Sequence, residues 1–304
     1  MPQLPMENMH RFSHEAMATV YEIWIHHEDA GYARGAATEA FRVLDQLEQD
    51  LSSYIENSDI SQLNALDVGE STVVGLDTFT CLRQCMQLYM ITSGVFDITI
   101  GALLDVWLDD EKELLQPDAD AIRRAVERTG LHNIELDAER FVVKMVGGPV
   151  SLDLGGFGKG YAVDKMSETL TDWEAPRHFI HGGASSVLAA EAPENSPGWP
   201  ITLTNPFTQE VLEKRSLLNK TLGSSGLQKG RHIIDPRTAK PLRRARATWS
   251  TAPTAAFSDG LSTAFMLLSI DEIRQLIADF PEFGALLVFE NSSENDESVV
   301  RVNF

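Results

Sequence analysis

Several features are scarce in this 304-residue sequence, and each shortage removes a class of protein. Only two cysteines occur, Cys81 and Cys85, so the sequence supplies neither a disulfide framework nor a cysteine-rich zinc site. Their four-residue spacing lies within a helical pattern and puts both on one helix face, which favours packing in the core.

Long apolar runs are also missing, and the first 14 residues are polar. We therefore expect no signal peptide and no transmembrane segment. The cytoplasm is the expected location, although the mature form of an exported periplasmic or membrane-associated protein would have the same N-terminus.

Positive charge is in the minority. The sequence has 25 Lys and Arg against 45 Asp and Glu, a formal net charge of -20. Such a surface argues against nucleic acid or an anionic membrane as the main partner. An acidic protein that handles phosphates must confine positive charge to its site, which favours a bound metal ion. Apolar residues make up 43%, enough for one large domain or two small ones.

Both common nucleotide fingerprints are absent, yet residues 151–165 contain a glycine-rich turn. Four glycines fall within 155–160. We expect a strand over 149–154, then the turn, then a helix starting near Gly160. Free N–H groups and the helix dipole would form an anion site there. Asp153 beside a bound phosphate would need a cation, and Mg²⁺ suits that role. The alternative is an ordinary strand-to-helix connection.

The rest of the chain mixes helical and strand patterns without a regular strand–helix alternation. This predicts an α+β fold of antiparallel-rich sheets with flanking helices. We expect helices over 31–53, 76–93, 118–130 and 271–280, and one more opened by Ser258 or Asp259 as N-cap. Strands are expected over 12–27 (led in by Met17), 133–137, 140–146, 178–191 (broken by a glycine turn), 201–205 paired with 211–213, 222–226, 248–256 and 284–289.

Three acids, Asp97, Asp153 and Asp259, stand at glycine-marked positions. Asp259 and Thr263 are four residues apart on a predicted helix, so their oxygens share a face and could bind one cation. Taken singly, each Asp is more typical of a turn or a cap. Together with the glycine turn they indicate a metal-assisted phosphate site.

The sequence resembles the FAD:protein FMN transferases, also called the ApbE family. The most specific pieces are Asp-Leu-Gly-Gly-x-x-Lys-Gly-Tyr at 153–161 and His-Ile-Ile-Asp-Pro-Arg-Thr at 232–238. Further matching pieces follow in the same order, at 17–19, 54 with 58–64, 94–101, 182–183 and 259–264. The resemblance implies one domain over 1–304, with 1–11 and 291–304 peripheral.

The resemblance also implies an enzyme that binds FAD and Mg²⁺. It would join FMN to a Thr or Ser hydroxyl of an acceptor protein, expected to be a redox protein, and release AMP. By position, the FAD contacts would be Met17, Tyr54, Val95, Phe96, Asp97, Asp153, Lys159 and Ile234. The metal ligands would be Gly156 (through its carbonyl), Asp259 and Thr263, with His232 and Asp259 as the catalytic residues.

Several of these residues have ordinary alternatives. Tyr54 offers a ring for stacking, or it packs in its loop. Lys159 could pair with a phosphate, or it is a solvated lysine at a helix start. His232 titrates near neutrality and could accept the proton of the incoming hydroxyl, although a lone His is more often structural.

A few positions depart from the family pattern. Gly158 and Gly260 stand where Ala is common, and Ala184 replaces a common acid. Ala239 replaces a usual Gly, and the stretch between Gly226 and His232 is short and basic. These changes leave the predicted metal and FAD positions intact but alter the expected contacts with the acceptor. Two alternatives therefore stand beside transfer: an FAD pyrophosphatase giving FMN and AMP, and a catalytically impaired FAD-binding protein.

Overall fold

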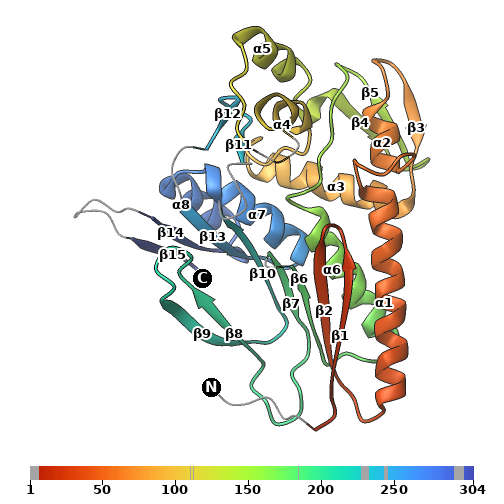
Figure 1. The fold of residues 1–304 in the computed structure, drawn as a ribbon, viewed down its shortest axis with the longest axis vertical. Helices are drawn as coiled ribbons and strands as arrows, with labels where there is room; N and C mark the ends of the chain where they lie inside the picture. The colour runs from red at the N-terminus through yellow and green to blue at the C-terminus, as the bar shows by residue number, and fades with distance from the viewer. Residues whose placement is uncertain are drawn as a thin grey trace.

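The computed structural model describes residues 7–109, 111, 113–183, 185–226, 233–242, 246–290 and 298–304. Its centre is an eight-stranded antiparallel sheet with the strand order β1-β2-β6-β7-β10-β13-β14-β15 (Figure 1). The strands of this sheet are β1 (Met9–Ala16), β2 (Thr19–His26), β6 (His178–Gly182), β7 (Ser186–Ala189), β10 (Lys220–Gly226), β13 (Arg246–Thr251), β14 (Gly284–Phe289) and β15 (Val299–Val302). The α+β prediction is confirmed.

Helices cover one face of the sheet and a hairpin covers the other. Alternation along the strands decides which side chain goes where: Ile23 and Ile180 are fully buried in the main core, whereas Trp24 and Phe179 pack against the hairpin. The hairpin strands are β8 (Trp199–Thr204) and β9 (Val211–Leu217). The helices are α1 (Ala30–Leu51), α2 (Asp59–Asn64), α3 (Leu76–Ile91), α4 (Gly101–Trp107), α5 (Ala119–Glu127), α6 (Gly158–Asp172), α7 (Ala255–Leu267) and α8 (Ile270–Asp279).

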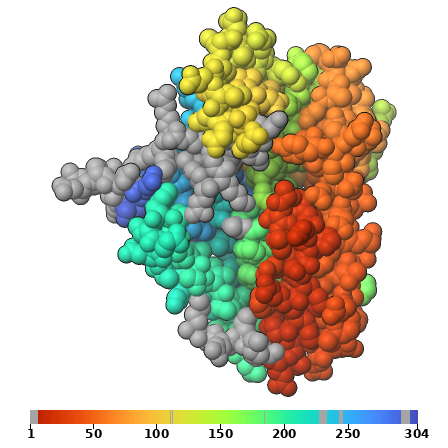
Figure 2. Space-filling view, in the orientation of Figure 1, coloured from red at the N-terminus to blue at the C-terminus, as the bar shows by residue number. Residues whose placement is uncertain are grey.

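Smaller elements sit at one end of the sheet. A three-stranded sheet has the order β3-β5-β4, from β3 (Ser71–Val73), β5 (Val142–Met145) and β4 (Ile134–Asp137), the last preceded by a short 3₁₀ helix, η1 (Leu131–Asn133). The pair β11 (Ile234–Asp235) and β12 (Lys240–Pro241) lies beside α4. Figure 2 shows the α4–α5 segment (yellow) as a lobe above the β1–β2 hairpin (red).

Many expected elements are confirmed. The helices predicted over 31–53, 76–93, 118–130 and 271–280 are α1, α3, α5 and α8, and the pairing of 201–205 with 211–213 is the β8–β9 hairpin. Cys81 and Cys85 are buried and free, as core packing requires. In the part of the chain that the structure describes, no helix combines the length and the apolar character needed to cross a bilayer.

The single strand predicted over residues 12–27 is wrong, because the chain reverses at Met17 and Ala18. Both residues have left-handed backbones, with φ of 49° and 55°. Such a turn is normally marked by Asn-Gly, and neither residue stands at these two positions. Tertiary contact helps to hold the turn, because the Met17 N–H donates to the Glu48 carboxylate at 2.5 Å.

The strand predicted over 149–154 is also wrong. Only an isolated bridge forms, between Ser151 and Ile100. The Asn64 side chain takes the place of a neighbouring strand: its amide donates to the Leu152 carbonyl at 3.1 Å and its carbonyl accepts the Leu152 N–H at 2.6 Å. The segment is therefore extended without belonging to a sheet.

Candidate active site

Helix α7 carries Asp259 and Thr263, and it begins earlier than the sequence predicts. Its N-cap is Thr254, whose hydroxyl accepts the Phe257 N–H at 3.2 Å. The prediction of Ser258 or Asp259 as N-cap is therefore wrong. Asp259 lies in the second turn, where its side chain is only 2% exposed and points into the protein instead of closing a helix end.

Asp259 reaches across to the first turn of α6. Its carboxylate accepts the Gly160 N–H at 3.1 Å, and it also takes a hydrogen bond from the Ser186 side chain. Burial raises the pKa of Asp259, while the Lys159 charge and these two hydrogen bonds act in the opposite direction. A carboxylate so deeply buried is unfavourable when ionised, and a cation bound to it would relieve that cost.

Oxygen atoms gather beside this carboxylate. Thr263 is one turn further along α7, and its hydroxyl lies 3.2 Å from that of Ser225 on β10. Gly156 faces the same hydroxyl, since a Cβ on Gly156 would sit 3.1 Å from Thr263 Oγ1. The structure thus brings Gly156 and Thr263 together, as the sequence predicts.

The donor chemistry suits a hard cation. Carboxylate, hydroxyl and backbone carbonyl oxygens are ligands that Mg²⁺ accepts, and it usually takes few carboxylates with phosphate oxygens completing its shell. Among the described residues, no group of three or more His, Cys, Asp or Glu side chains is arranged to hold a metal. Asp97 and Asp153, which the sequence predicts as FAD contacts, accept hydrogen bonds within their own turns.

The glycine turn before α6 is partly filled by the chain itself. Asp153 accepts the Gly155 N–H at 2.8 Å, and Lys159 donates to the Gly155 carbonyl at 2.5 Å. Because Gly160 N–H already bonds to Asp259, it is not free for the anion that the sequence predicts there. Lys159 has a partly exposed side chain, which can reorient toward a ligand phosphate.

The predicted contacts at 95–97 are largely buried. Val95 and Phe96 are 3% and 5% exposed, and the Phe96 ring packs on that of Phe157 at 5.8 Å between centroids. A Cβ on Gly156 would lie 3.6 Å from the Phe96 ring. Asp97 accepts both the N–H and the hydroxyl of Thr99, at 2.8 and 2.6 Å, and burial raises its pKa.

Met17 lies in the left-handed turn between β1 and β2 and contacts Tyr21. The buried Tyr21 hydroxyl donates to the Met17 sulfur at 3.3 Å. Burial raises the pKa of Tyr21 far above its ordinary value, and the nearby charges of Asp259 and Glu48 add to that effect. Met17 is therefore linked through Tyr21 to the surroundings of Asp259.

The remaining predicted residues differ in position. Tyr54 is 83% exposed, and partial desolvation together with the charges of Asp153 and Asp105 raises its pKa. Ile234 is buried beside α4, in a small cluster with Leu103 and Ala239. His232 lies outside the described residues.

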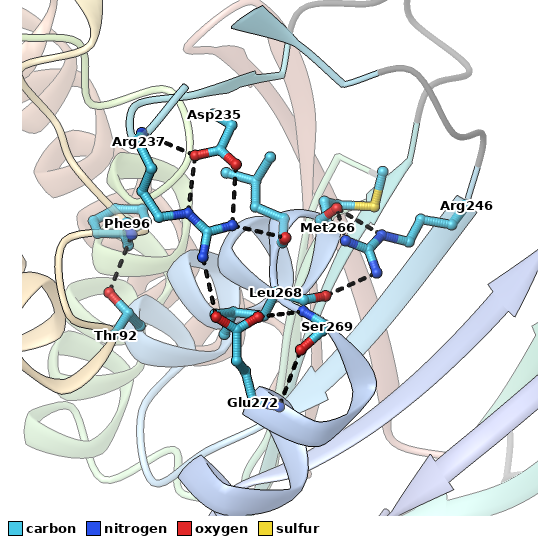
Figure 3. A network of polar contacts seen from close by, with 10 residues as sticks. Thr92, Phe96, Asp235, Arg237, Arg246, Met266, Leu268, Ser269 and Glu272 are labelled. Atoms are coloured by element: carbon cyan, nitrogen blue, oxygen red, sulfur yellow. Dashed lines mark hydrogen bonds and ion pairs between the residues drawn. The ribbon is translucent and has the colours of Figure 1, made fainter. Parts of the chain in front are cut away.

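The sequence patterns missed several residues that shape the site. Ser186 and Ser225 lie on the neighbouring strands β7 and β10, outside every motif. Asp164 lies inside the 151–165 stretch, but its contact is with helix α7. Arg237 lies in the 232–238 motif but received no role, and Arg246 lies outside every motif. Figure 3 shows these two guanidinium groups at the C-terminal end of α7.

Two cavities lie on the other face of the sheet. They have volumes of about 250 and 350 Å³ and share Phe179 and His181 as lining residues. Burial lowers the pKa of His181, whereas the charge of Glu22 raises it. Residues of β8 line part of both cavities, so they lie on the hairpin side of the sheet, opposite the helices that include Asp259.

Known proteins resemble this chain in both sequence and fold. The ApbE family profile matches residues 17–287. The FAD:protein FMN transferase of Vibrio cholerae is 23% identical over 302 residues, covering 93% of this chain and 88% of that protein. The enzyme of the same name from Chlamydia pneumoniae is 27% identical over 239 residues, covering 74% and 73%.

Solved structures agree on the architecture. The ApbE protein of Thermotoga maritima superposes with a TM-score of 0.84 at 24% identity, covering 96% of each chain. The flavin transferase ApbE of Vibrio cholerae superposes with a TM-score of 0.83 at 19% identity, covering 97% of each chain. With a buried carboxylate and a hydroxyl on α7 facing the glycine turn before α6, and with a family profile that matches most of its length, the chain belongs to the ApbE family.

Proposed function

We propose that this chain is an FAD:protein FMN transferase, which uses Mg²⁺ to move FMN from FAD to a Thr or Ser hydroxyl of an acceptor protein and releases AMP. The names of its relatives support flavin transfer. The structural observation that carries the proposal is the buried Asp259 beside Thr263 and Gly156, an oxygen-rich site next to a glycine turn.

The metal residues have distinct roles in this proposal. Asp259 supplies the charge that holds Mg²⁺, while the Thr263 hydroxyl and the Gly156 carbonyl supply neutral oxygens. When bound, Mg²⁺ acts as a Lewis acid that neutralises charge on the pyrophosphate.

Other residues hold the substrate. The exposed ring of Tyr54 is available to stack on a flavin or adenine ring, and Lys159 exchanges the Gly155 carbonyl for a phosphate oxygen. Met17, Val95, Phe96, Asp97, Asp153 and Ile234 complete the proposed FAD contacts. His232 is the proposed base toward the acceptor hydroxyl.

The experiment compares wild type with Asp259→Asn, incubated with FAD, MgCl₂ and a Thr-containing acceptor domain. We expect AMP release and a covalent mass gain of one FMN on the acceptor, both dependent on Mg²⁺. Asp259→Asn keeps the side-chain size but removes the charge, so both signals should fall by at least a hundredfold. Asp271→Asn, at an exposed position in α8, is the matched control and should retain them.

The outcome also separates the alternatives. AMP release without labelled acceptor indicates an FAD pyrophosphatase, in which water takes the place of the hydroxyl. Binding of FAD without AMP release indicates an impaired FAD-binding protein. Normal Mg²⁺-dependent turnover in Asp259→Asn would remove this residue from the metal site.

A further inference from the structure

Helix α7, which carries Asp259 and Thr263, is held at both ends by polar side chains from other segments. At its C-terminal end, Arg246 donates to the carbonyls of Met266, with Nε at 2.6 Å, and of Leu268, at 3.0 Å. Arg237 donates to the Leu267 carbonyl at 3.1 Å (Figure 3). Cations at this end complement the helix dipole and satisfy carbonyls that the helix leaves unpaired.

The N-terminal end is held by an acid from another helix. Asp164 of α6 accepts the N–H groups of Ala255 and Ala256, one on each carboxylate oxygen, both at 2.8 Å. These are the first two N–H groups of α7, which lack partners inside the helix. With the Thr254 hydroxyl on Phe257, the first turn is satisfied by side chains.

Each of the two helices supplies an Asp side chain that accepts backbone N–H groups of the other helix. Asp164 of α6 holds the start of α7, while Asp259 of α7 accepts the Gly160 N–H in the first turn of α6. Gly160 and Asp164 are four residues apart, as are Ala255 and Asp259, so the two contacts lie one turn apart on each helix. A side chain at Gly160 would overlap the Ala255 carbonyl, so the helices also touch backbone to backbone.

We propose that Asp164 is a positioning residue for the metal site. Because Asp164 accepts two N–H groups of α7, it fixes the rotation and the axial position of α7 relative to α6. The position of α7 in turn determines where the oxygens of Asp259 and Thr263 lie relative to Gly156. The inference rests on the proposed function, because it assumes that these oxygens bind Mg²⁺. Residues that orient metal ligands typically change metal affinity or activity by about 10- to 100-fold when mutated.

The test measures metal affinity in Asp164→Asn and Asp164→Ala. Binding of MnCl₂ is followed by calorimetry in the presence of ADP, which offers a pyrophosphate but no flavin. AMP release from saturating FAD is then measured against MgCl₂ concentration. We expect the half-saturating metal concentration to rise by about tenfold or more, with kcat at saturating metal and the KM for FAD changed much less.

Asp29 provides the matched control. It too accepts two N–H groups at a helix start, those of Gly31 at 2.7 Å and Tyr32 at 3.0 Å, but it lies at the exposed beginning of α1. Asp29→Asn and Asp29→Ala should leave metal affinity unchanged. If Asp164→Ala fails to fold, Asp164→Asn, which keeps one acceptor oxygen, provides the measurement, with circular dichroism to confirm its fold.

Two results would overturn the inference: an unchanged metal affinity in folded Asp164→Asn, or an equal loss in the Asp29 variants. Asp259→Asn, measured in the same titration, distinguishes a failure of the positioning role of Asp164 from a failure of the proposed metal site. If Asp259→Asn loses the metal response while Asp164→Asn keeps it, only the positioning role of Asp164 is refuted. If Asp259→Asn binds metal normally, both the proposed metal site and the positioning role are refuted.

Discussion

Gly160→Ala adds one methyl group at the point where α6 meets α7. A Cβ there would lie closer than 3.0 Å to three backbone atoms, the carbonyl oxygen and carbon of Ala255 and the Cα of Ala256. Backbone atoms in the first turn of a packed helix cannot swing aside as a flexible side chain can. We therefore expect α7 to move away from α6 and the Gly160–Asp259 hydrogen bond to lengthen.

The magnitude follows from two opposing effects. Replacing Gly by Ala inside a helix favours folding by about 1 kcal/mol when the site has room. Forcing a methyl group into a packed contact costs about 1–3 kcal/mol, and contact with backbone favours the upper end. The free energy of unfolding should therefore fall by about 1–2 kcal/mol.

Gly158→Ala is the matched control, two residues earlier on the same helix. A Cβ at Gly158 would lie 3.6 Å from Leu154 Cβ, an ordinary van der Waals contact. This variant should be as stable as wild type or more stable, by up to about 1 kcal/mol. Urea denaturation measures both variants, and the Mg²⁺ dependence of AMP release reports on Asp259.

A Gly160→Ala protein as stable as Gly158→Ala, with normal Mg²⁺ dependence, would refute the reasoning. It would mean that α6 and α7 separate at little cost and that their contact does not set the position of Asp259.

Two further predictions follow from the same structure. Burial raises the pKa of Asp164 from 3.8 to about 7, against the effect of its two N–H partners, so the folded protein holds a proton there that the unfolded chain loses above about pH 4. This contribution to stability is complete below about pH 4 and is lost as pH rises to about 7, at about 1.4 kcal/mol per pH unit. Urea denaturation gives the free energies of unfolding of metal-free wild type and Asp164→Asn. The difference between these two free energies should change by an amount on the order of 4 kcal/mol over that pH range. A difference that stays constant with pH would contradict the prediction. Tyr54→Ala should weaken FAD binding in a fluorescence titration by about fivefold, from a loss of roughly 1 kcal/mol of stacking, whereas Tyr54→Phe should not; equal affinity in both variants would assign the ring to the loop alone.

The sequence by itself determined the elements whose local patterns are strong. The α1 and α3 helices follow from apolar periodicity, although α3 ends at Ile91 with Thr92 as its C-cap, two residues before Gly94. The Asp153–Tyr161 stretch and the Asp259/Thr263 spacing point to α6 and α7, which are hydrogen-bonded to each other in the structure. Spacing suffices within one helix because its geometry is fixed, so residues four apart must share a face.

Only the tertiary structure decided the features that depend on contacts between distant segments. The Met17–Ala18 reversal has no turn residues, and a carboxylate 31 positions away, on Glu48, helps to hold it. The 149–154 segment is hydrogen-bonded to the side-chain amide of Asn64. Periodic patterns of apolar residues in the sequence cannot reveal such a contact. Asp164 looked like one more residue of a motif, yet its partners are 91 and 92 positions away. Local propensity cannot encode such a contact, because its energy exists only after the two helices have packed.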